Sequence, residues 1–200
     1  MTSMLAAEPR AAGTASAARL LARWWSRPTA GELQEWSALW PQALETATVL
    51  GLSPESVERV RGAATSSSEE ELLAEYERLL VGPGRPACPP YESLWRSDQG
   101  RFERGRLMGP AAADVVQIYR DLGLRVRKDA HELPDHLVIE LEALAHACES
   151  GATEQASQLL DAHLGLWVPA FCDAVSADTA QPFYAELARL TPAWMAALVG

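Results

Sequence analysis

The chain is poor in cysteine and has no paired cysteine motif. Its three cysteines, Cys88, Cys148 and Cys172, lie far apart, and no two of them are spaced as Cys-x-x-Cys. A disulfide framework needs an even set of cysteines, and a zinc knuckle needs closely spaced pairs. The sequence therefore predicts neither a disulfide-stapled fold nor a cysteine-ligated zinc site, and it suits a reducing compartment.

Long apolar runs and an excess of positive charge are also missing. No uncharged apolar stretch approaches the ~18 residues of a membrane-spanning helix. Glu8 and Arg10 interrupt the N-terminal segment where a secretory signal would have its apolar run. The net charge of −10 would repel nucleic-acid phosphates over most of the surface and would favour a basic partner. We therefore expect a cytoplasmic protein that neither inserts into a membrane nor binds nucleic acid.

Signatures of catalysis are absent as well. The sequence has no Gly-x-Ser-x-Gly, phosphate-binding loop, Ser/His/Asp or Cys/His pattern. The densest group of titratable residues runs from His131 to His136, but these two histidines are five apart with Pro134 between them. A zincin site needs histidines four apart on one helix. We expect no enzyme, cofactor or metal site; the alternatives are a metal- or nucleotide-dependent hydrolase using His131, Asp135 and His136, or a helical adaptor protein.

The chain does have helical periodicity. Apolar residues recur at spacings of three and four almost throughout, and no segment shows the two-residue alternation of a strand. A chain of 200 residues that is 48% hydrophobic can bury one core. The sequence predicts one all-α domain over residues 1–200, a bundle of about eight to ten helices. Most of its seven tryptophans should lie in the core or line a groove.

Local signals predict where several helices begin. Ser53-Pro54 is an N-cap followed by proline at the first helical position, and the run from Ser66 to Glu71 contains overlapping capping boxes. Pro134 is predicted to open a helix, and Thr191-Pro192 to cap a separate last one. We expect residues 1–15 to be disordered.

Two stretches interrupt the periodicity. Residues 81–109 are rich in proline and glycine, and a connection of this length is usually functional or disordered. Tyr91 and Trp95 within it argue for packing against the core. Residues 123–134 form a charged link that we interpret as a hinge.

Ordinary structural roles explain several polar residues. Asp135 fits the first turn of a helix, where a carboxylate meets free backbone N–H groups. His163 lies in an apolar stripe and is expected to bond to a neighbouring helix. Two arginine-rich runs are expected to be solvated or paired with nearby acids, with an anion site as the alternative. These runs consist of Arg96, Arg101, Arg104 and Arg106, and of Arg120, Arg125, Arg127 and Lys128.

Two separated segments resemble the TorD/DmsD family of molybdoenzyme chaperones. The first comprises residues 76–84, Tyr-Glu-Arg-Leu-Leu-Val-Gly-Pro-Gly, and residues 89–95, Pro-Pro-Tyr-Glu-Ser-Leu-Trp. The second is Glu-Leu-Pro-Asp-His-Leu at residues 132–137, with Glu-Leu-Glu at residues 140–142 behind it. The resemblance covers roughly residues 70–200 in the right order. It departs at Leu80, where the family often has Phe.

The resemblance implies an all-helical cytoplasmic chaperone for assembly of a molybdopterin oxidoreductase of the DMSO reductase family. Such a protein binds the twin-arginine leader, or the body, of the catalytic subunit until the cofactor is inserted. Weak binding of guanine nucleotide or molybdopterin cofactor is a further implication. The long connections of the chain leave a monomer or a domain-swapped dimer as alternatives.

The same resemblance assigns the peptide-binding residues. At the hinge they are Glu132, Pro134, Asp135 and His136. On the apolar side they are Tyr76, Leu79, Leu80, Pro90, Tyr91, Ser93 and Trp95. A leader offers two cations and an apolar segment, which suits a groove with carboxylates at one end and aromatic walls. We therefore predict that the hinge and the segment around Tyr91 meet in space as one cleft.

Overall fold

The computed structural model describes residues 2–84, 86–96, 107–125 and 132–199, and these parts contain helices and no strand. The helices, two of them short π-helical segments, are α1 (Thr2–Trp24), α2 (Glu32–Ser37), α3 (Trp40–Val49), α4 (Pro54–Thr65), α5 (Glu69–Tyr76), η1 (Glu77–Val81), α6 (Glu92–Trp95), α7 (Pro110–Asp121), α8 (Leu137–Glu149), α9 (Thr153–Gln158), η2 (Leu159–Leu164), α10 (Gly165–Asp178) and α11 (Pro182–Val199). The predicted all-α class is confirmed. No described helix is long and apolar enough to cross a membrane.

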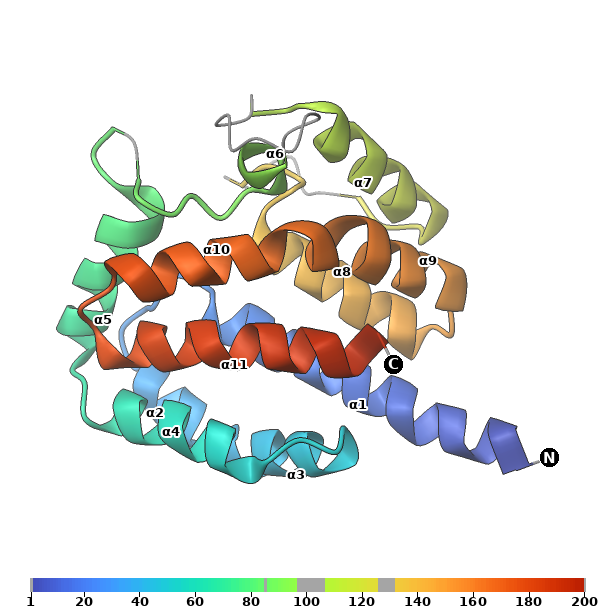
Figure 1. Cartoon of the computed structure of the whole chain (residues 1–200), viewed down its shortest axis with the longest axis horizontal. Helices are drawn as coiled ribbons and strands as arrows, with labels where there is room; N and C mark the ends of the chain where they lie inside the picture. Colours follow the sequence, from blue (N-terminus) through green and yellow to red (C-terminus); the bar gives the residue numbers. More distant parts are fainter. Residues whose placement is uncertain (1, 85, 97–106, 126–131, 200) are drawn as a thin grey trace.

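The helices are arranged around an antiparallel hairpin of α10 and α11 (Figure 1). Helix α11 also packs on α4, while α1 packs along α8 and against α3. Helices α6 and α7 lie at the top of the view, where α6 contacts both α7 and α10. Residues 89–95 and 132–137, which belong to the segments that resemble the chaperone family, therefore lie together at one end of the bundle, at α6 and the start of α8.

Tryptophans form much of the core, as the sequence predicted. Six of the seven are buried: Trp24, Trp25, Trp36, Trp40, Trp167 and Trp194. Trp24 stacks on Trp40 with ring centroids 5.1 Å apart, and Trp36 stacks on Phe183 at 4.9 Å. Each pair joins the N-terminal helices to one another or to α11, so aromatic contacts between distant segments stabilise the bundle.

The predicted helix starts at Ser53 and Ser68 are confirmed. The Ser53 hydroxyl accepts a hydrogen bond from the backbone N–H of Glu55 at the start of α4. Ser68 and Glu71 form a capping box at the start of α5, because each side chain accepts from the other's backbone N–H. These caps satisfy donors that a helix leaves free at its N-terminus.

Two predicted helix boundaries at prolines were wrong. Pro192 lies inside α11, which continues to Val199. The Thr191 hydroxyl donates to the Leu187 carbonyl (2.7 Å) and accepts from the Trp25 indole N–H (3.0 Å), so it bonds within the helix and to the core instead of capping a new helix. Pro134 does not open a helix but lies in the turn before α8. The helix begins three residues later, at Leu137, with His136 as its N-cap.

The N-terminal segment also differs from the prediction of disorder over residues 1–15. Helix α1 begins at Thr2, and its residues Thr14 and Ala15 are buried. The segment is rich in alanine, the residue with the highest helix propensity, and the same helix continues into the core. Low amphipathic patterning at its start concealed a helix that composition alone would favour.

The π-helical segment η2 fixes the approach of the C-terminal helices to α6. Gly165 follows it, and a Cβ atom at this position would lie 2.5 Å from the Leu160 carbonyl oxygen. Such a contact is closer than packed atoms tolerate, so the turn needs glycine. The segment buries His163 among its apolar neighbours and directs it toward α6.

Candidate functional site

The hinge and the proline-rich segment meet at the backbone. The Leu137 N–H donates to the Pro90 carbonyl, and the Glu92 N–H donates to the Asp135 carbonyl. The donor–acceptor distance is 2.9 Å in both bonds. These bonds form an isolated antiparallel bridge between Tyr91 and His136. We call residues 89–95 and 132–137 together the clasp. The predicted proximity of the two segments is confirmed, whereas a cleft that takes a peptide stays a prediction.

Side chains reinforce this backbone contact. The Asp135 Oδ2 atom accepts from the Ser93 N–H at 3.0 Å, and the Tyr91 hydroxyl donates to the Glu132 Oε2 atom at 2.5 Å. The rings of Tyr91 and His136 meet edge to face at 5.1 Å. The Trp95 indole N–H donates to the Pro89 carbonyl at 2.6 Å. Each half of the clasp therefore orients the other.

His136 has a second role as the N-cap of α8. Its Nδ1 atom accepts a hydrogen bond from the Val138 N–H at a distance of 3.2 Å. This bond requires that Nδ1 carries no proton. Burial lowers the pKa of His136, against the opposing effect of the nearby carboxylates of Glu132 and Asp135. The histidine is therefore held neutral in the interior, where it is part of the fold.

The predicted site residues divide by burial. Seven are buried: Tyr76, Leu79, Leu80, Pro90, Ser93, Asp135 and His136. The others are at least partly accessible: Tyr91, Trp95, Glu132 and Pro134. Asp135 is fully buried and lies before α8, so the expectation that it occupies the first helical turn was wrong. It binds the clasp backbone instead.

The sequence missed a group of polar residues next to the clasp, all of them buried except Arg96, which is partly exposed. We call Glu92, Arg96, Glu140, His163 and Trp167 the buried polar cluster. The Glu92 Oε2 atom lies 2.8 Å from His163 Nδ1, and the Glu92 Oε1 atom accepts from Arg96 Nη1 at 2.7 Å. The Glu140 Oε2 atom accepts from the Trp167 indole N–H at 3.1 Å. The prediction that His163 bonds to a neighbouring helix is confirmed. Among the arginines of the first basic run, Arg96 is paired, and Arg101, Arg104 and Arg106 lie outside the described residues.

Two carboxyls of this cluster interact closely. Burial, followed by the nearby charge of Glu92, raises the pKa of Glu140 well above its ordinary value, which favours the protonated form. Burial, with the same carboxylates, also raises the pKa of Tyr119, whose hydroxyl donates to the Pro134 carbonyl at 2.9 Å. A neutral Glu140 lowers the cost of holding Glu92 and Asp135 in the same interior.

Metal binding was the chemical alternative for this region. Across residues 2–84, 86–96, 107–125 and 132–199, no three His, Cys, Asp or Glu side chains are grouped so that they could hold a metal ion. His131, one of the three residues of that alternative, lies outside these ranges.

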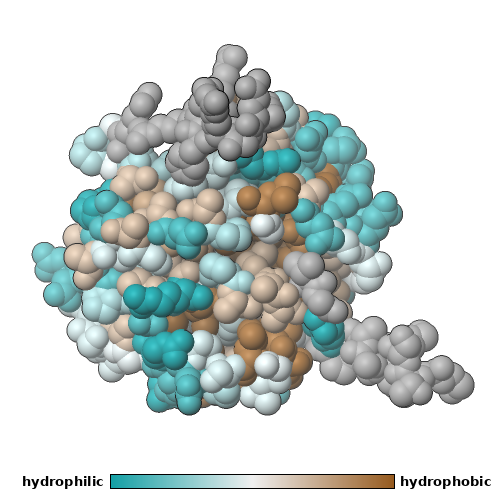
Figure 2. All heavy atoms as spheres, in the orientation of Figure 1, coloured by the Kyte–Doolittle hydropathy of each residue, from teal (hydrophilic) through white to brown (hydrophobic). Residues whose placement is uncertain are grey.

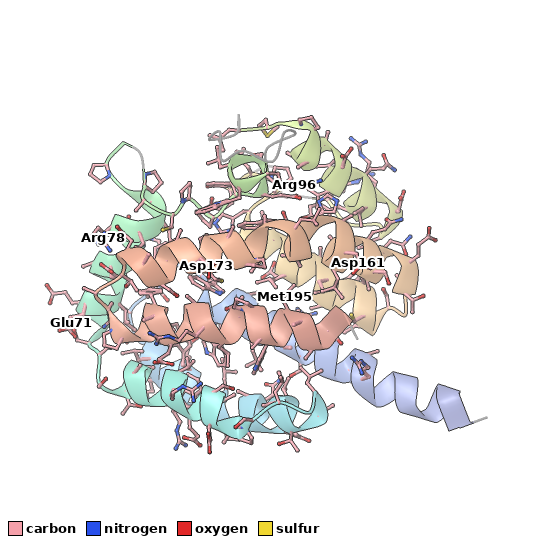
Figure 3. The ribbon with its side chains drawn as sticks, in the orientation of Figure 1. Glu71, Arg78, Arg96, Asp161, Asp173 and Met195 are labelled. Carbon is pink, nitrogen blue, oxygen red and sulfur yellow. The ribbon has the colours of Figure 1, made fainter. Side chains whose placement is uncertain are left out.

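Figure 3 shows Arg96 near α6, on the same face of the molecule as Asp161 and Asp173, whose carboxylates are solvent-exposed.

Comparisons with known proteins agree with the motifs. The sequence model of the family described as nitrate reductase delta subunit matches residues 29–173. The Tat proofreading chaperone DmsD of Salmonella typhi is 31% identical over 169 residues, which cover 82% of this chain and 76% of the relative. The chaperone protein TorD of Shewanella loihica is 28% identical over 124 residues, which cover 62% and 59%.

A solved structure agrees on the fold. A crystal structure described as that of a redox enzyme maturation protein from Archaeoglobus fulgidus matches with a TM-score of 0.63 and 23% sequence identity. The match covers 91% of this chain and 93% of that one. The fold therefore has a solved counterpart over most of the chain.

Proposed function

Because the chain belongs to the family of nitrate reductase delta subunits, which includes the TorD and DmsD chaperones, we propose that it binds the twin-arginine leader of a molybdoenzyme catalytic subunit in the cytoplasm. Family membership makes it a chaperone of molybdoenzyme maturation and not an enzyme. The hydrolase and adaptor alternatives are accordingly not favoured.

The observation that supports leader binding is the joining of both family motifs in the clasp. Glu132 presents a carboxylate whose side chain is 46% exposed, held by the Tyr91 hydroxyl. Tyr91, Trp95 and Pro134 lie beside it with part of their surface accessible. A carboxylate next to aromatic and proline surface suits a peptide that carries arginine followed by apolar residues.

The buried residues of the motif have a different role in this proposal. The Asp135 side chain binds the clasp backbone at Ser93, and His136 caps α8, so these buried residues hold the accessible residues of the site in place. Tyr76, Leu79 and Leu80 are buried in the hydrophobic core and contribute to the site through the fold. Substituting any of these residues should therefore affect stability together with peptide affinity.

Calorimetry with a synthetic twin-arginine leader tests the proposal. Glu132→Gln should weaken binding about fivefold, as the loss of one partly exposed charge-assisted hydrogen bond predicts. Glu58→Gln is the matched control, because Glu58 is also a partly exposed glutamate bonded to one neighbouring side chain, Arg61 on α4. A leader that does not bind the wild-type protein, or binds equally well when both arginines are replaced by glutamine, would contradict the proposal.

A further inference from the structure

Glu92 is a fully buried carboxylate that one arginine reaches from the surface. Its side chain has 0% exposure, whereas that of Arg96 is 35% exposed, and the two are joined by the 2.7 Å contact described above. We propose that Glu92 is the base of a guanidinium-binding site, which Arg96 fills in the free protein and an arginine of the client peptide takes over. This inference rests on the proposed function, which it deepens.

The contact made by Arg96 is weaker than an arginine can make. Among the described residues, which do not include 97–106, only its Nη1 atom is bound, to Glu92 Oε1 and, at 3.1 Å, to the carbonyl of Ala162. By comparison, Arg19 donates two parallel hydrogen bonds to the exposed carboxylate of Glu149, from Nε at 2.7 Å and from Nη2 at 2.6 Å. Two-pronged contacts are the strong form of arginine–carboxylate pairing. The site therefore holds its own arginine by less than the full interaction and leaves room for exchange.

The surroundings of Glu92 contain hydrogen-bond acceptors that the described residues do not satisfy. Asp135 Oδ1 and Ser93 Oγ are buried and have no hydrogen-bond partner among those residues. Ser93 and Asp135 are bonded to each other through the Ser93 backbone N–H, which donates to Asp135 Oδ2. A guanidinium group carries five N–H donors and no acceptor, so it supplies what such atoms lack. The chemistry of the cluster thus favours an incoming arginine over a neutral group.

An apolar surface adjoins the proposed site. Leu166 lies one helical turn beyond Ala162, whose carbonyl binds Arg96, and it is 55% exposed. Figure 2 shows hydrophobic surface where η2 joins α10, on the face that carries Arg96 in Figure 3. The partly accessible Trp95 precedes Arg96 in the chain. A client segment with arginine followed by apolar residues would therefore find both kinds of partner together.

A purely structural role for Arg96 makes the opposite prediction. If Arg96 only neutralises Glu92, its removal leaves leader affinity unchanged or lower. If it occupies a client site, Arg96→Ala removes a competitor and raises leader affinity, by about tenfold for one charge-assisted hydrogen bond. Arg59→Ala is the matched control, because Arg59 forms an exposed ion pair with Glu186 on another side of the bundle. Its leader affinity should equal that of the wild type.

The role of Glu92 as the acceptor is tested by combining Arg96→Ala with Glu92→Gln, which keeps the size of the Glu92 side chain. The gain from Arg96→Ala should disappear in the double variant, because the two residues act on one interaction. An Arg96→Ala variant whose affinity does not rise, or whose gain survives Glu92→Gln, overturns the inference. Calorimetry with the leader on folded variants, checked by circular dichroism, provides both measurements.

A leader-free experiment separates this inference from the proposed function. Millimolar methylguanidinium should raise the melting temperature of Arg96→Ala by filling the vacated site, while methylammonium, a cation without the planar fork, should raise it less. The wild type and the Arg96→Ala/Glu92→Gln double variant should not respond. The guanidinium site is overturned, even if the leader binds, in either of two cases. In one, methylguanidinium changes the melting temperature of all three proteins equally; in the other, it does not change that of Arg96→Ala. A leader that fails to bind while methylguanidinium acts as expected counts against the proposed function alone.

Discussion

Glu92 and Glu140 illustrate how single side chains beneath the clasp depend on their neighbours. Glu92 is held by His163 and Arg96, while Glu140 is held by the Trp167 indole and lies against Glu92. Two interior carboxylates in contact cannot both be charged without a large electrostatic cost. The raised pKa of Glu140 follows from this arrangement, and a protonated Glu140 can donate toward Glu92 where an ionised one cannot.

Replacing Glu140 with glutamine tests this protonation. The folded protein holds the Glu140 proton more tightly than the unfolded chain, where the pKa is near 4.5. Glu140 therefore favours folding below that pH, and the advantage is lost as the pH rises toward the folded-state pKa. Glutamine mimics the protonated form at every pH, so Glu140→Gln should match the wild type near pH 4.5 and exceed its free energy of unfolding at pH 7.5 by ~1 kcal/mol or more, since each pKa unit contributes ~1.4 kcal/mol.

Urea unfolding of both proteins at the two pH values provides the measurement. Glu142→Gln is the control, because Glu142 is on the same helix but exposed. Its difference from the wild type should not change with pH by a comparable amount. A pH-independent difference for Glu140→Gln would mean that the pKa of Glu140 is the same in the folded and unfolded states.

Among the structural elements, η2 has the most specific sequence requirement. Its π-helical turn is closed by Gly165, where any side chain would press on the Leu160 carbonyl oxygen. Gly165→Ala should lower the free energy of unfolding by about 2 kcal/mol, a typical cost of overpacking. It should also loosen the contact between His163 and Glu92, because the same turn presents His163 to α6.

Gly62→Ala is the matched control for this substitution. Gly62 lies inside α4, and a Cβ there would meet nothing within 4 Å. Alanine should therefore stabilise α4 by about 0.5–1 kcal/mol through its higher helix propensity. Thermal or urea unfolding gives both values. Equal effects at the two glycines would contradict a special requirement at Gly165.

Elements differed in how far the sequence predicted them. The starts of α4 and α5 were predicted because serine caps and nearby glutamates act within a few residues. The continuity of α11 through Pro192 was not, because it coincides with contacts of Thr191 to Leu187 and to the distant Trp25. The buried polar cluster was missed for the same reason. A glutamate at position 92 or 140 looks like a surface residue until the fold brings the other partners to it.

At the scale of the whole molecule, the clasp joins segments that are about forty residues apart in sequence, and family motifs alone indicated that they meet. Periodicity could not supply that contact, because it reports which face of a helix is buried and not which segment buries it. The motifs predicted the location of the candidate site. They did not predict that most of its residues are buried, since burial depends on how α6, α8 and η2 pack together.

The net charge of the chain predicts that the association of a basic leader depends on the salt concentration. The chain carries a formal charge of −10, so the leader should be attracted before it makes contact. Raising the salt from about 0.05 to 0.5 M shortens the screening length from about 14 to 4 Å, so the association rate constant should fall on the order of tenfold while the dissociation rate constant changes less. Stopped-flow tryptophan fluorescence can follow both rates, with Trp95→Phe identifying the signal from the clasp. A leader whose arginines are replaced by glutamine should lose most of the salt dependence. If its association rate constant falls as steeply as that of the natural leader, the arginines are not the source of the attraction.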